Sequence, residues 1–213
     1  MEKKRFIFDI DGTLLKEDYS MEEKFFKEIL SKDDAEVFIP KISEYLKNYE
    51  DLFSNYDVNS LSEFLSSESG VDITPEIIYK WRSVISNYDS VTFEGVSKTL
   101  LYLKGHDYSV VALSNWFADD QIRRLRKANI LEYFDNVYGG DFYLKPSEES
   151  YLNAAGRFDV KDCIVVGDYL ENDVYGPYKV GMDALYFDRK NRNDYNKKLV
   201  KSIKRFDELM WRY

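Results

Sequence analysis

Short apolar runs separated by polar, helix-like segments dominate the chain from residue 108 onward. Such runs are typical of strands that are buried on both faces of a parallel sheet. Because they alternate with helical patterns, we expect a doubly wound α/β fold with parallel strands. One further apolar run lies near the N-terminus. The predicted strands cover residues 6–10, 108–113, 136–138, 163–166 and 184–187.

Helix boundary signals lie between these strands. Asp119 or Asp120 is expected to cap a helix that runs to residue 128. Ser147 is the expected N-cap of the next helix, and two glutamates follow in its first turn, where the helix dipole favours acids. Residues 202–211 are expected to add a last strand or helix to the core.

Residues 16–89 show no strand pattern and instead contain four helical stretches. The last stretch begins with Thr74 and Pro75, a capping residue followed by proline at the first helical position. We therefore expect a core domain of residues 1–15 and 90–213, with a smaller helical domain of residues 16–89 inserted after the first strand. The four helices are expected at residues 21–30, 35–49, 61–66 and 75–87.

The composition is that of a globular protein with an acidic charge balance. Hydrophobic residues make up 44% of the 213 and aromatic residues 16%, which excludes a disordered chain. A formal net charge of -9 argues against nucleic acid and against an anionic membrane as partners. The basic cluster at residues 123–127 is expected to be the solvated face of an amphipathic helix.

Cysteine and histidine each occur once, so several kinds of site are excluded. Cys163 has no partner for an intrachain disulfide, and His106 alone rules out a multi-histidine metal site. The N-terminus passes into the first strand without a signal-peptide pattern, and no apolar stretch approaches transmembrane length. We expect a cytoplasmic protein. Nothing in the pattern indicates its oligomeric state.

Polar side chains follow the predicted strands at their carboxyl ends, where open α/β sheets bind ligands. Several carboxylates without histidine or thiol suit Mg²⁺. Serine, asparagine and lysine side chains can bind phosphoryl oxygens. The set therefore predicts a phosphate site with a hard cation. Its members are Asp9, Asp11, Ser114, Asn115, Lys145, Asp168, Asn172 and Asp173.

The end of the first strand carries the strongest signal. Asp9 and Asp11 lie two residues apart, so their side chains can point to the same face. Acids at the end of a buried strand are costly unless they are paired or bound to a metal. Gly12 permits a sharp turn, and Thr13 offers a hydroxyl at the same rim. Taken alone, the segment also fits an Asp-rich turn.

In these motifs the sequence resembles the haloacid dehalogenase-like (HAD) hydrolase superfamily. Four motifs match in order: Asp9–Thr13, Ser114–Asn115, Lys145–Pro146 and Gly167–Asp173. The first and fourth are highly specific, whereas the second and third are weak alone. The resemblance implies a Rossmann-like sheet domain, with the helical insert as a cap over the active site.

The resemblance also implies an activity, namely magnesium-dependent hydrolysis of a small phosphorylated metabolite through an aspartyl-phosphate. Asp9 would be the nucleophile. Asp11 would transfer protons, keep its side chain free and bind Mg²⁺ through its backbone carbonyl. Asp168 would be the other direct side-chain ligand of Mg²⁺. Asp173 would contact the metal, a metal-bound water or Lys145.

Phosphate contacts are implied for Thr13, Ser114, Asn115 and Lys145. Two other functions fit the same motifs. One is a phosphomutase resembling β-phosphoglucomutase, in which a second substrate hydroxyl accepts the phosphoryl group. The other is a non-catalytic binding protein on the same fold. The aromatic residues of the helical insert are expected mostly in its core, and the sequence selects none of them as a substrate contact.

Overall fold

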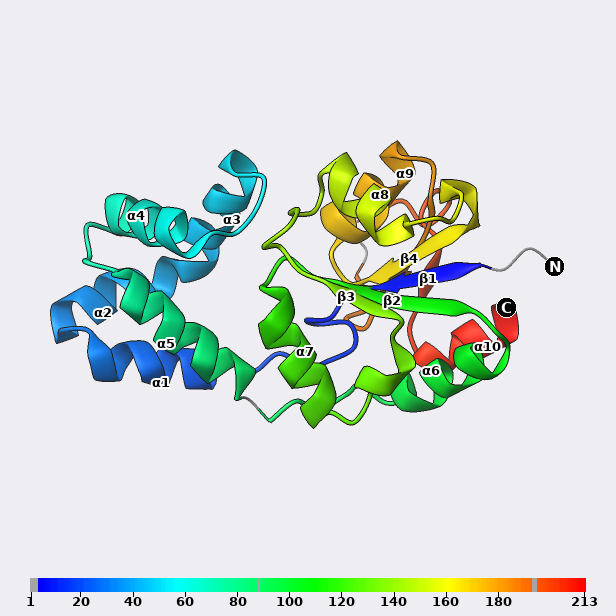
Figure 1. The fold of residues 1–213 in the computed structure, drawn as a ribbon, viewed down its shortest axis with the longest axis horizontal. Coiled ribbons are helices and arrows are strands. Elements are labelled where there is room, and N and C mark those ends of the chain that lie inside the picture. The colour runs from blue at the N-terminus through cyan, green and yellow to red at the C-terminus, as the bar shows by residue number, and fades with distance from the viewer. Residues whose placement is uncertain (1–3, 88, 193–194) are drawn as a thin grey trace.

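The core domain is a six-stranded parallel sheet with helices on both faces (Figure 1). The structure is a computed structural model, and it describes residues 4–87, 89–192 and 195–213. The strand order is β3-β2-β1-β4-β5-β6, so β1 lies inside the sheet between β2 and β4. The predicted doubly wound α/β fold is confirmed. The strands are β1 (Arg5–Phe8), β2 (Ser109–Leu113), β3 (Asn136–Tyr138), β4 (Cys163–Gly167), β5 (Asp183–Phe187) and β6 (Ser202–Ile203).

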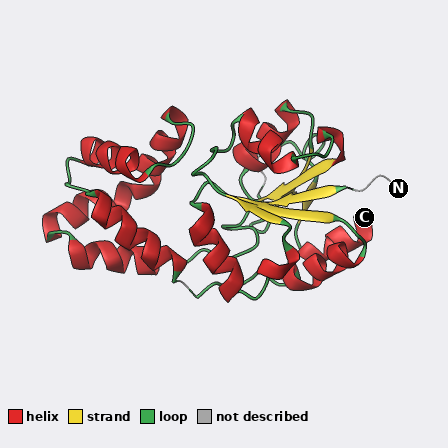
Figure 2. Ribbon diagram, viewed as in Figure 1, coloured by secondary structure: helices red, strands yellow, loops and turns green. Residues whose placement is uncertain are grey.

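Side chains of β1 alternate between two cores, one on each face of the sheet (Figure 2). Phe6 and Phe8 are buried against α6, α7 and α10, whereas Ile7 is buried against α8. Because helices cover both faces, the three positions after Arg5 are all apolar and the sequence shows no alternation. The helices of this domain are α6 (Val96–Gly105), α7 (Ala118–Lys127), α8 (Glu148–Ala155), α9 (Gly176–Lys179) and α10 (Leu209–Arg212).

The C-terminal segment completes the sheet. Strand β6 pairs with β5, and Leu209 of α10 joins the core that contains Phe6. The prediction for residues 202–211 is confirmed, since both a strand and a helix form there. Helix α6 was not indicated by the sequence pattern, although Leu100 and Leu103 bury one of its faces in the same core.

Five helices between β1 and α6 form what we call the helical lobe, residues 20–86 (Figure 1). The lobe has its own core around Trp81, whose ring lies 5.2 Å from that of Phe26 and 5.0 Å from that of Trp116. The helices are α1 (Ser20–Ile29), α2 (Lys32–Phe38), α3 (Ile42–Leu52), α4 (Val58–Ser69) and α5 (Pro75–Ser86).

The single helix predicted at residues 35–49 is wrong, because two helices form there. Helix α2 ends at Phe38 and α3 begins at Ile42, with a short 3₁₀ turn between them. That turn contains Pro40, which has no backbone N–H and whose ring clashes with the preceding helical turn.

The predicted cap of α7 is also wrong. The helix begins at Ala118, before Asp119 and Asp120, and the N–H of Ala118 donates to Asp141 Oδ1 at 2.8 Å. Asp120 instead faces the lobe, where it accepts bonds from Arg82 Nε at 2.8 Å and Ser86 Oγ at 3.0 Å. Asp120 therefore connects the core domain to the helical lobe instead of capping α7.

Backbone hydrogen bonds also connect the lobe to the core domain. The N–H of Tyr56 donates to the carbonyl of Gly140 at 2.7 Å, and the N–H of Leu144 donates to the carbonyl of Ser54 at 2.9 Å. Phe117 and Leu144 of the core domain are buried in the hydrophobic core of the lobe. The lobe therefore packs on the core domain rather than extending from it.

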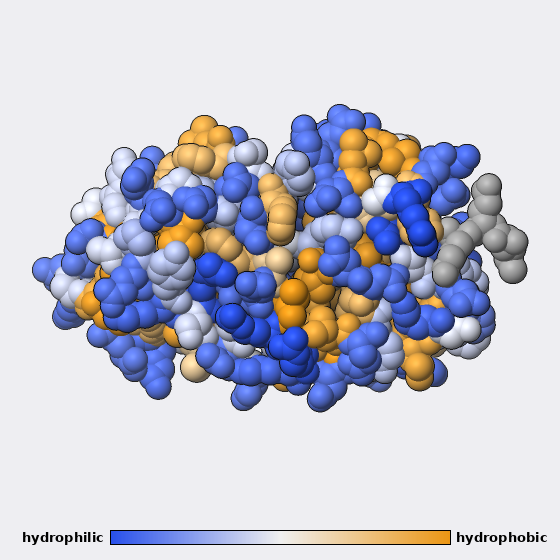
Figure 3. Space-filling model, in the orientation of Figure 1, coloured by the Kyte–Doolittle hydropathy of each residue, from blue (hydrophilic) through white to orange (hydrophobic). Residues whose placement is uncertain are grey.

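Hydrophilic residues cover most of the face seen in Figure 3, with smaller apolar patches between them. This agrees with a chain in which 32% of the residues are charged. Within the described ranges, no helix combines the length and the apolar character that crossing a bilayer requires.

We expect Phe206→Ala to lower the free energy of unfolding by about 3–5 kcal/mol, the usual cost of truncating a buried phenylalanine. Phe206 is fully buried, and its ring packs against Phe8 and Phe187. Urea unfolding followed by circular dichroism measures the change. Trp211→Ala is the matched control, because this side chain is 80% exposed in the same segment. Equal losses for both variants would contradict the packing described here.

Candidate active site

The predicted site residues meet at the carboxyl edge of the sheet. Asp9 follows β1, Ser114 follows β2 and Asp168 follows β4, and these three strands are neighbours. A cavity of about 760 Å³ lies between this edge and the helical lobe. All of the predicted site residues except Thr13 line it, namely Asp9, Asp11, Ser114, Asn115, Lys145, Asp168, Asn172 and Asp173.

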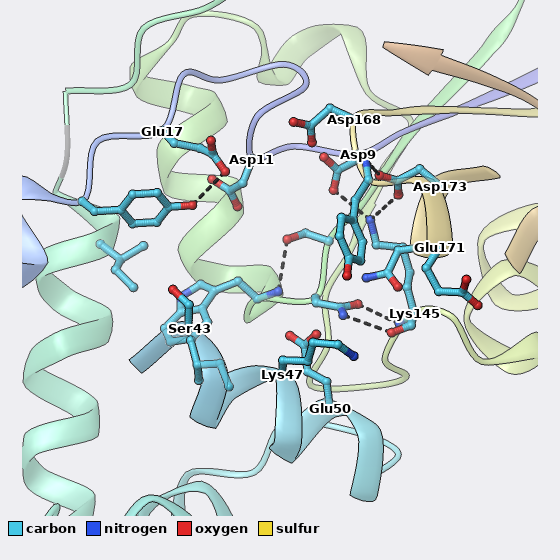
Figure 4. A pocket seen from close by; sticks show the side chains of 18 of the residues that line it. Asp9, Asp11, Glu17, Ser43, Lys47, Glu50, Lys145, Asp168, Glu171 and Asp173 are labelled. Carbon is cyan, nitrogen blue, oxygen red and sulfur yellow. Dashed lines mark hydrogen bonds and ion pairs between the residues drawn. The ribbon is translucent and has the colours of Figure 1, made fainter. Parts of the chain in front are cut away.

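Lys145 joins two of the carboxylates at the base of the cavity (Figure 4). Its Nζ donates to Asp9 Oδ1 at 2.8 Å and to Asp173 Oδ1 at 2.8 Å. The other oxygen of Asp173 accepts the N–H of Tyr169 at 3.0 Å. The side chains of Lys145 and Asp173 are almost fully buried, so each charge depends on its partners for compensation.

Burial and nearby charges shift the pKa values of Asp9, Asp168 and Lys145. Burial raises the pKa of Asp9 to about 8; Lys145 opposes the shift, while Asp173 and Asp168 add to it. Burial also raises the pKa of Asp168 to about 6, and Asp173 adds to that shift. Burial disfavours the charged form of Lys145, but its two carboxylate partners outweigh this effect and raise its pKa. The cluster therefore holds more negative charge than its lysine compensates.

Three of the acids can share one metal ion. Asp9, Asp168 and Asp173 each offer a carboxylate oxygen, and these oxygens lie within 4.8 Å of one another. An all-carboxylate set is typical of hard cations such as Mg²⁺. A divalent cation would also supply the positive charge that this cluster needs to stay ionised. The donor set therefore fits Mg²⁺. The side chain of Asp11 does not belong to it.

Two glycines allow the carboxylates to approach the backbone closely. Gly12 has a φ of +78°, and a Cβ there would lie 2.6 Å from Asp168 Oδ2. A Cβ on Gly167 would lie 2.2 Å from Asp173 Cγ. Because only glycine lacks this atom, both positions exclude any side chain while the acids keep their places.

Asn115 holds the backbone of Lys145 with both ends of its amide. Asn115 Oδ1 accepts the N–H of Lys145 at 2.7 Å, and Nδ2 donates to the carbonyl of Lys145 at 3.1 Å. This pair fixes the backbone that presents the ammonium group, near the end of the loop between β3 and α8. In this arrangement the amide is engaged with the protein, and a contact of Asn115 with phosphate stays a prediction.

The carboxylate of Asp11 is bound by helix α7. Its Oδ2 accepts from Gln121 Nε2 at 2.6 Å, and its Oδ1 accepts from Arg124 Nη1. Gln121 Nε2 also donates to Ser114 Oγ at 2.8 Å, so one amide joins two predicted site residues. The side chain of Asp11 is therefore held by α7, outside the group of acids that could share a metal ion.

The basic cluster at residues 123–127 is not uniformly solvated. Arg123 and Arg126 are exposed as predicted, but Arg124 is 5% exposed and faces Asp11. The prediction was wrong for this residue because a charge pattern does not tell which turn of a helix meets an acid from a distant part of the chain. A signal was present in the spacing, since Gln121 and Arg124 are three residues apart and so share a helix face.

Arg189 is a further residue that the sequence did not single out. It follows β5, and its Nη2 donates to Asp168 Oδ2 at 2.9 Å and to Glu17 Oε2 at 2.9 Å. Its Nε donates to the carbonyl of Gly12 at 3.0 Å. Arg189 thereby connects the turn after β1 with the acid after β4.

Thr13 and Asn172 are the two remaining residues of the predicted motifs. Thr13 is fully buried beneath the turn, and its hydroxyl has no hydrogen-bond partner within the part of the chain that the structure describes. Its phosphate contact stays a prediction. Asn172 lines the cavity, and its backbone carbonyl accepts the hydroxyl of Tyr151.

A family model described as haloacid dehalogenase-like hydrolase matches residues 6–187. The chain belongs to the haloacid dehalogenase-like hydrolase family. A glyceraldehyde 3-phosphate phosphatase from Methanopyrus kandleri is 25% identical over 209 residues, covering 90% of this chain and 89% of that protein. The protein of the same name from Pyrococcus furiosus is 32% identical over 97 residues, 44% of this chain and 40% of its own length. The structure of a HAD phosphatase from Thermococcus onnurineus is similar with a TM-score of 0.65 at 23% identity, covering 98% of this chain and 96% of that one.

In metal-free protein, we expect stability to fall as pH rises from about 4 to about 8. Folding raises the pKa of Asp9 from 3.8 to about 8 and that of Asp168 to about 6, so the folded state binds more protons across this range. The free energy of unfolding then decreases by up to about 1.4 kcal/mol per pH unit for each carboxyl. Urea unfolding in EDTA across this range measures the slope. Asp9→Asn should flatten it, and parallel slopes for the two proteins would contradict the assignment.

Proposed function

We propose that the protein is a magnesium-dependent phosphohydrolase that acts on a small phosphorylated metabolite through an aspartyl-phosphate on Asp9. The family match and the relatives named as phosphatases support the assignment as a phosphatase of this hydrolase family. The proposed magnesium dependence and the aspartyl-phosphate rest on one observation. The buried carboxylate of Asp9 contacts Lys145 beside Asp168 and Asp173.

The proposed reaction has two steps that use the same residues. First, a carboxylate oxygen of Asp9 forms a bond to phosphorus while the bond from phosphorus to the leaving oxygen breaks, and Asp11 protonates that oxygen. Then water attacks phosphorus, Asp11 takes its proton, and the bond to Asp9 breaks to give inorganic phosphate. Lys145 and Ser114 would stabilise the charge on the phosphoryl oxygens in both steps.

Magnesium held by Asp9, Asp168 and Asp173 would neutralise charge on the phosphoryl group and keep Asp9 ionised. Among these ligands, Asp173 already binds Lys145, so it would orient the ammonium group as well. The backbone carbonyl of Asp11 stays a proposed further ligand.

The helical insert would act as a cap over this site. We place it at residues 16–89, between core segments 1–15 and 90–213, as the sequence pattern suggests. Support comes from the cavity, because residues of α3 and α5 line it opposite the carboxylates. A cap in this position would exclude water while the phosphoryl group is transferred.

We expect the protein to release inorganic phosphate from a panel of phosphomonoesters only when Mg²⁺ is present. Asp9→Asn should lower kcat by a factor on the order of 10³ or more, because no nucleophile remains. A phosphate-release assay measures both effects, and circular dichroism checks that the variant folds. Activity that survives EDTA, or that persists in Asp9→Asn, would refute the mechanism. Transfer of the phosphoryl group to a sugar hydroxyl instead of water would identify a phosphomutase.

Gln121 and Arg124 are proposed as positioning residues for Asp11. Since both bind its carboxylate, Arg124→Gln should misplace the proton donor. General acid catalysis contributes roughly 10²–10⁴-fold, so we expect kcat/KM for alkyl phosphates to fall by about a hundredfold. The loss for p-nitrophenyl phosphate should be much smaller, because p-nitrophenolate leaves without a proton.

Arg126→Gln is the matched control for this prediction, since it removes the same charge from an exposed position on the same helix. Steady-state kinetics with both kinds of substrate give the comparison. Arg124→Lys should recover part of the loss with alkyl phosphates. Equal losses with both substrates would mean that Arg124 supports the fold rather than Asp11.

A further inference from the structure

One face of helix α3 forms the wall of the cavity opposite the carboxylates. Ser43, Leu46, Lys47 and Glu50 line the cavity and follow the spacing i, i+3, i+4, i+7, so they share one helix face. In Figure 4, Ser43, Lys47 and Glu50 lie on this helix across the cavity from Lys145. A substrate whose phosphoryl group sits at Asp9 would direct the rest of the molecule toward this wall.

Glu50 is held in a fixed position on that wall. Its Oε1 accepts the hydroxyl of Tyr56 at 2.8 Å. Tyr56 is 2% exposed, stacks on Tyr49 and Phe117, and bonds through its backbone to Gly140 of the core domain. The carboxylate of Glu50 is therefore positioned by the core domain as well as by α3. Burial raises the pKa of Glu50, while Tyr56, Asn115 and the positive charges of Lys145 and Lys47 oppose the shift.

The charge on this wall is negative. Lys47 lies one turn from Glu50, but its Nζ donates to both oxygens of Asp51, at 3.0 and 2.9 Å. Because Asp51 lines the cavity as well, the wall carries two carboxylates against one ammonium group. A carboxylate has room for several hydrogen-bond donors, so Glu50 can accept from substrate hydroxyls in addition to Tyr56. A second anionic group of the substrate would be repelled at the same place.

We propose that Glu50 binds hydroxyl groups of the leaving group and excludes leaving groups that carry a second negative charge. The substrate would then be the phosphomonoester of a small, neutral polyhydroxy compound. This proposal rests on the proposed phosphohydrolase activity and adds the substrate class to it.

The test compares sn-glycerol 3-phosphate with 3-phosphoglycerate as competitive inhibitors of p-nitrophenyl phosphate hydrolysis. The two compounds share a carbon skeleton and differ chiefly in a hydroxymethyl group against a carboxylate. We expect the wild-type protein to bind the glycerol compound at least about tenfold more tightly, since like charges placed together are costly. Inhibition constants report this preference even if neither compound is turned over.

Glu50→Gln keeps the shape of the side chain and removes its charge, so it should reduce the ratio of inhibition constants by about tenfold. Glu44→Gln removes an exposed charge from the same helix and should leave the ratio unchanged. Thermal unfolding checks that both variants fold, and the wild-type ratio tests the proposal without them.

Equal or tighter inhibition of the wild-type protein by 3-phosphoglycerate would overturn the proposal. An unchanged ratio in Glu50→Gln would also overturn it. Failure of the proposed function has a different signature, because p-nitrophenyl phosphate would then not be hydrolysed by the wild-type protein in the presence of Mg²⁺.

Discussion

The buried ammonium group of Lys145 is the interaction on which the arrangement of the site depends. Parallel strands that end at one edge bring several carboxylates together, and burial makes their mutual repulsion costly. Lys145 binds two of them, Asp9 and Asp173, from a loop outside the sheet. That loop is in turn fixed by the amide of Asn115. The lysine therefore connects the edge of the sheet to the loop that contacts the helical lobe.

The two acids after β1 have different neighbours, although the strand presents them only two residues apart. Asp9 faces Lys145 inside the carboxylate cluster, whereas Asp11 faces Gln121 and Arg124 of α7. Different surroundings let two chemically identical groups take different roles, as in other sites with paired carboxylates. Here the difference comes from separate elements of the fold, a loop for one acid and a helix for the other.

Much of the fold and of the carboxylate cluster could be predicted because both depend on local patterns. Apolar runs indicated five of the strands, and the common edge of parallel strands then brought Asp9 and Asp168 together. Arg124 and Arg189 could not be predicted in this way. Each binds an acid far away in the sequence, 113 residues from Asp11 in the case of Arg124, and such pairing depends on how the elements pack.

The two backbone hydrogen bonds between the lobe and the loop before Lys145 have a consequence for how this family member could be altered. Leu144, the residue before the lysine, donates to Ser54, and Gly140 accepts from Tyr56. Deleting the helical insert would leave these two peptide groups unpaired and would uncover Phe117 and Leu144. The helical lobe is thus a structural support of the loop that carries Lys145. A foreign insert exchanged into this protein would have to supply a donor and an acceptor at the same two points.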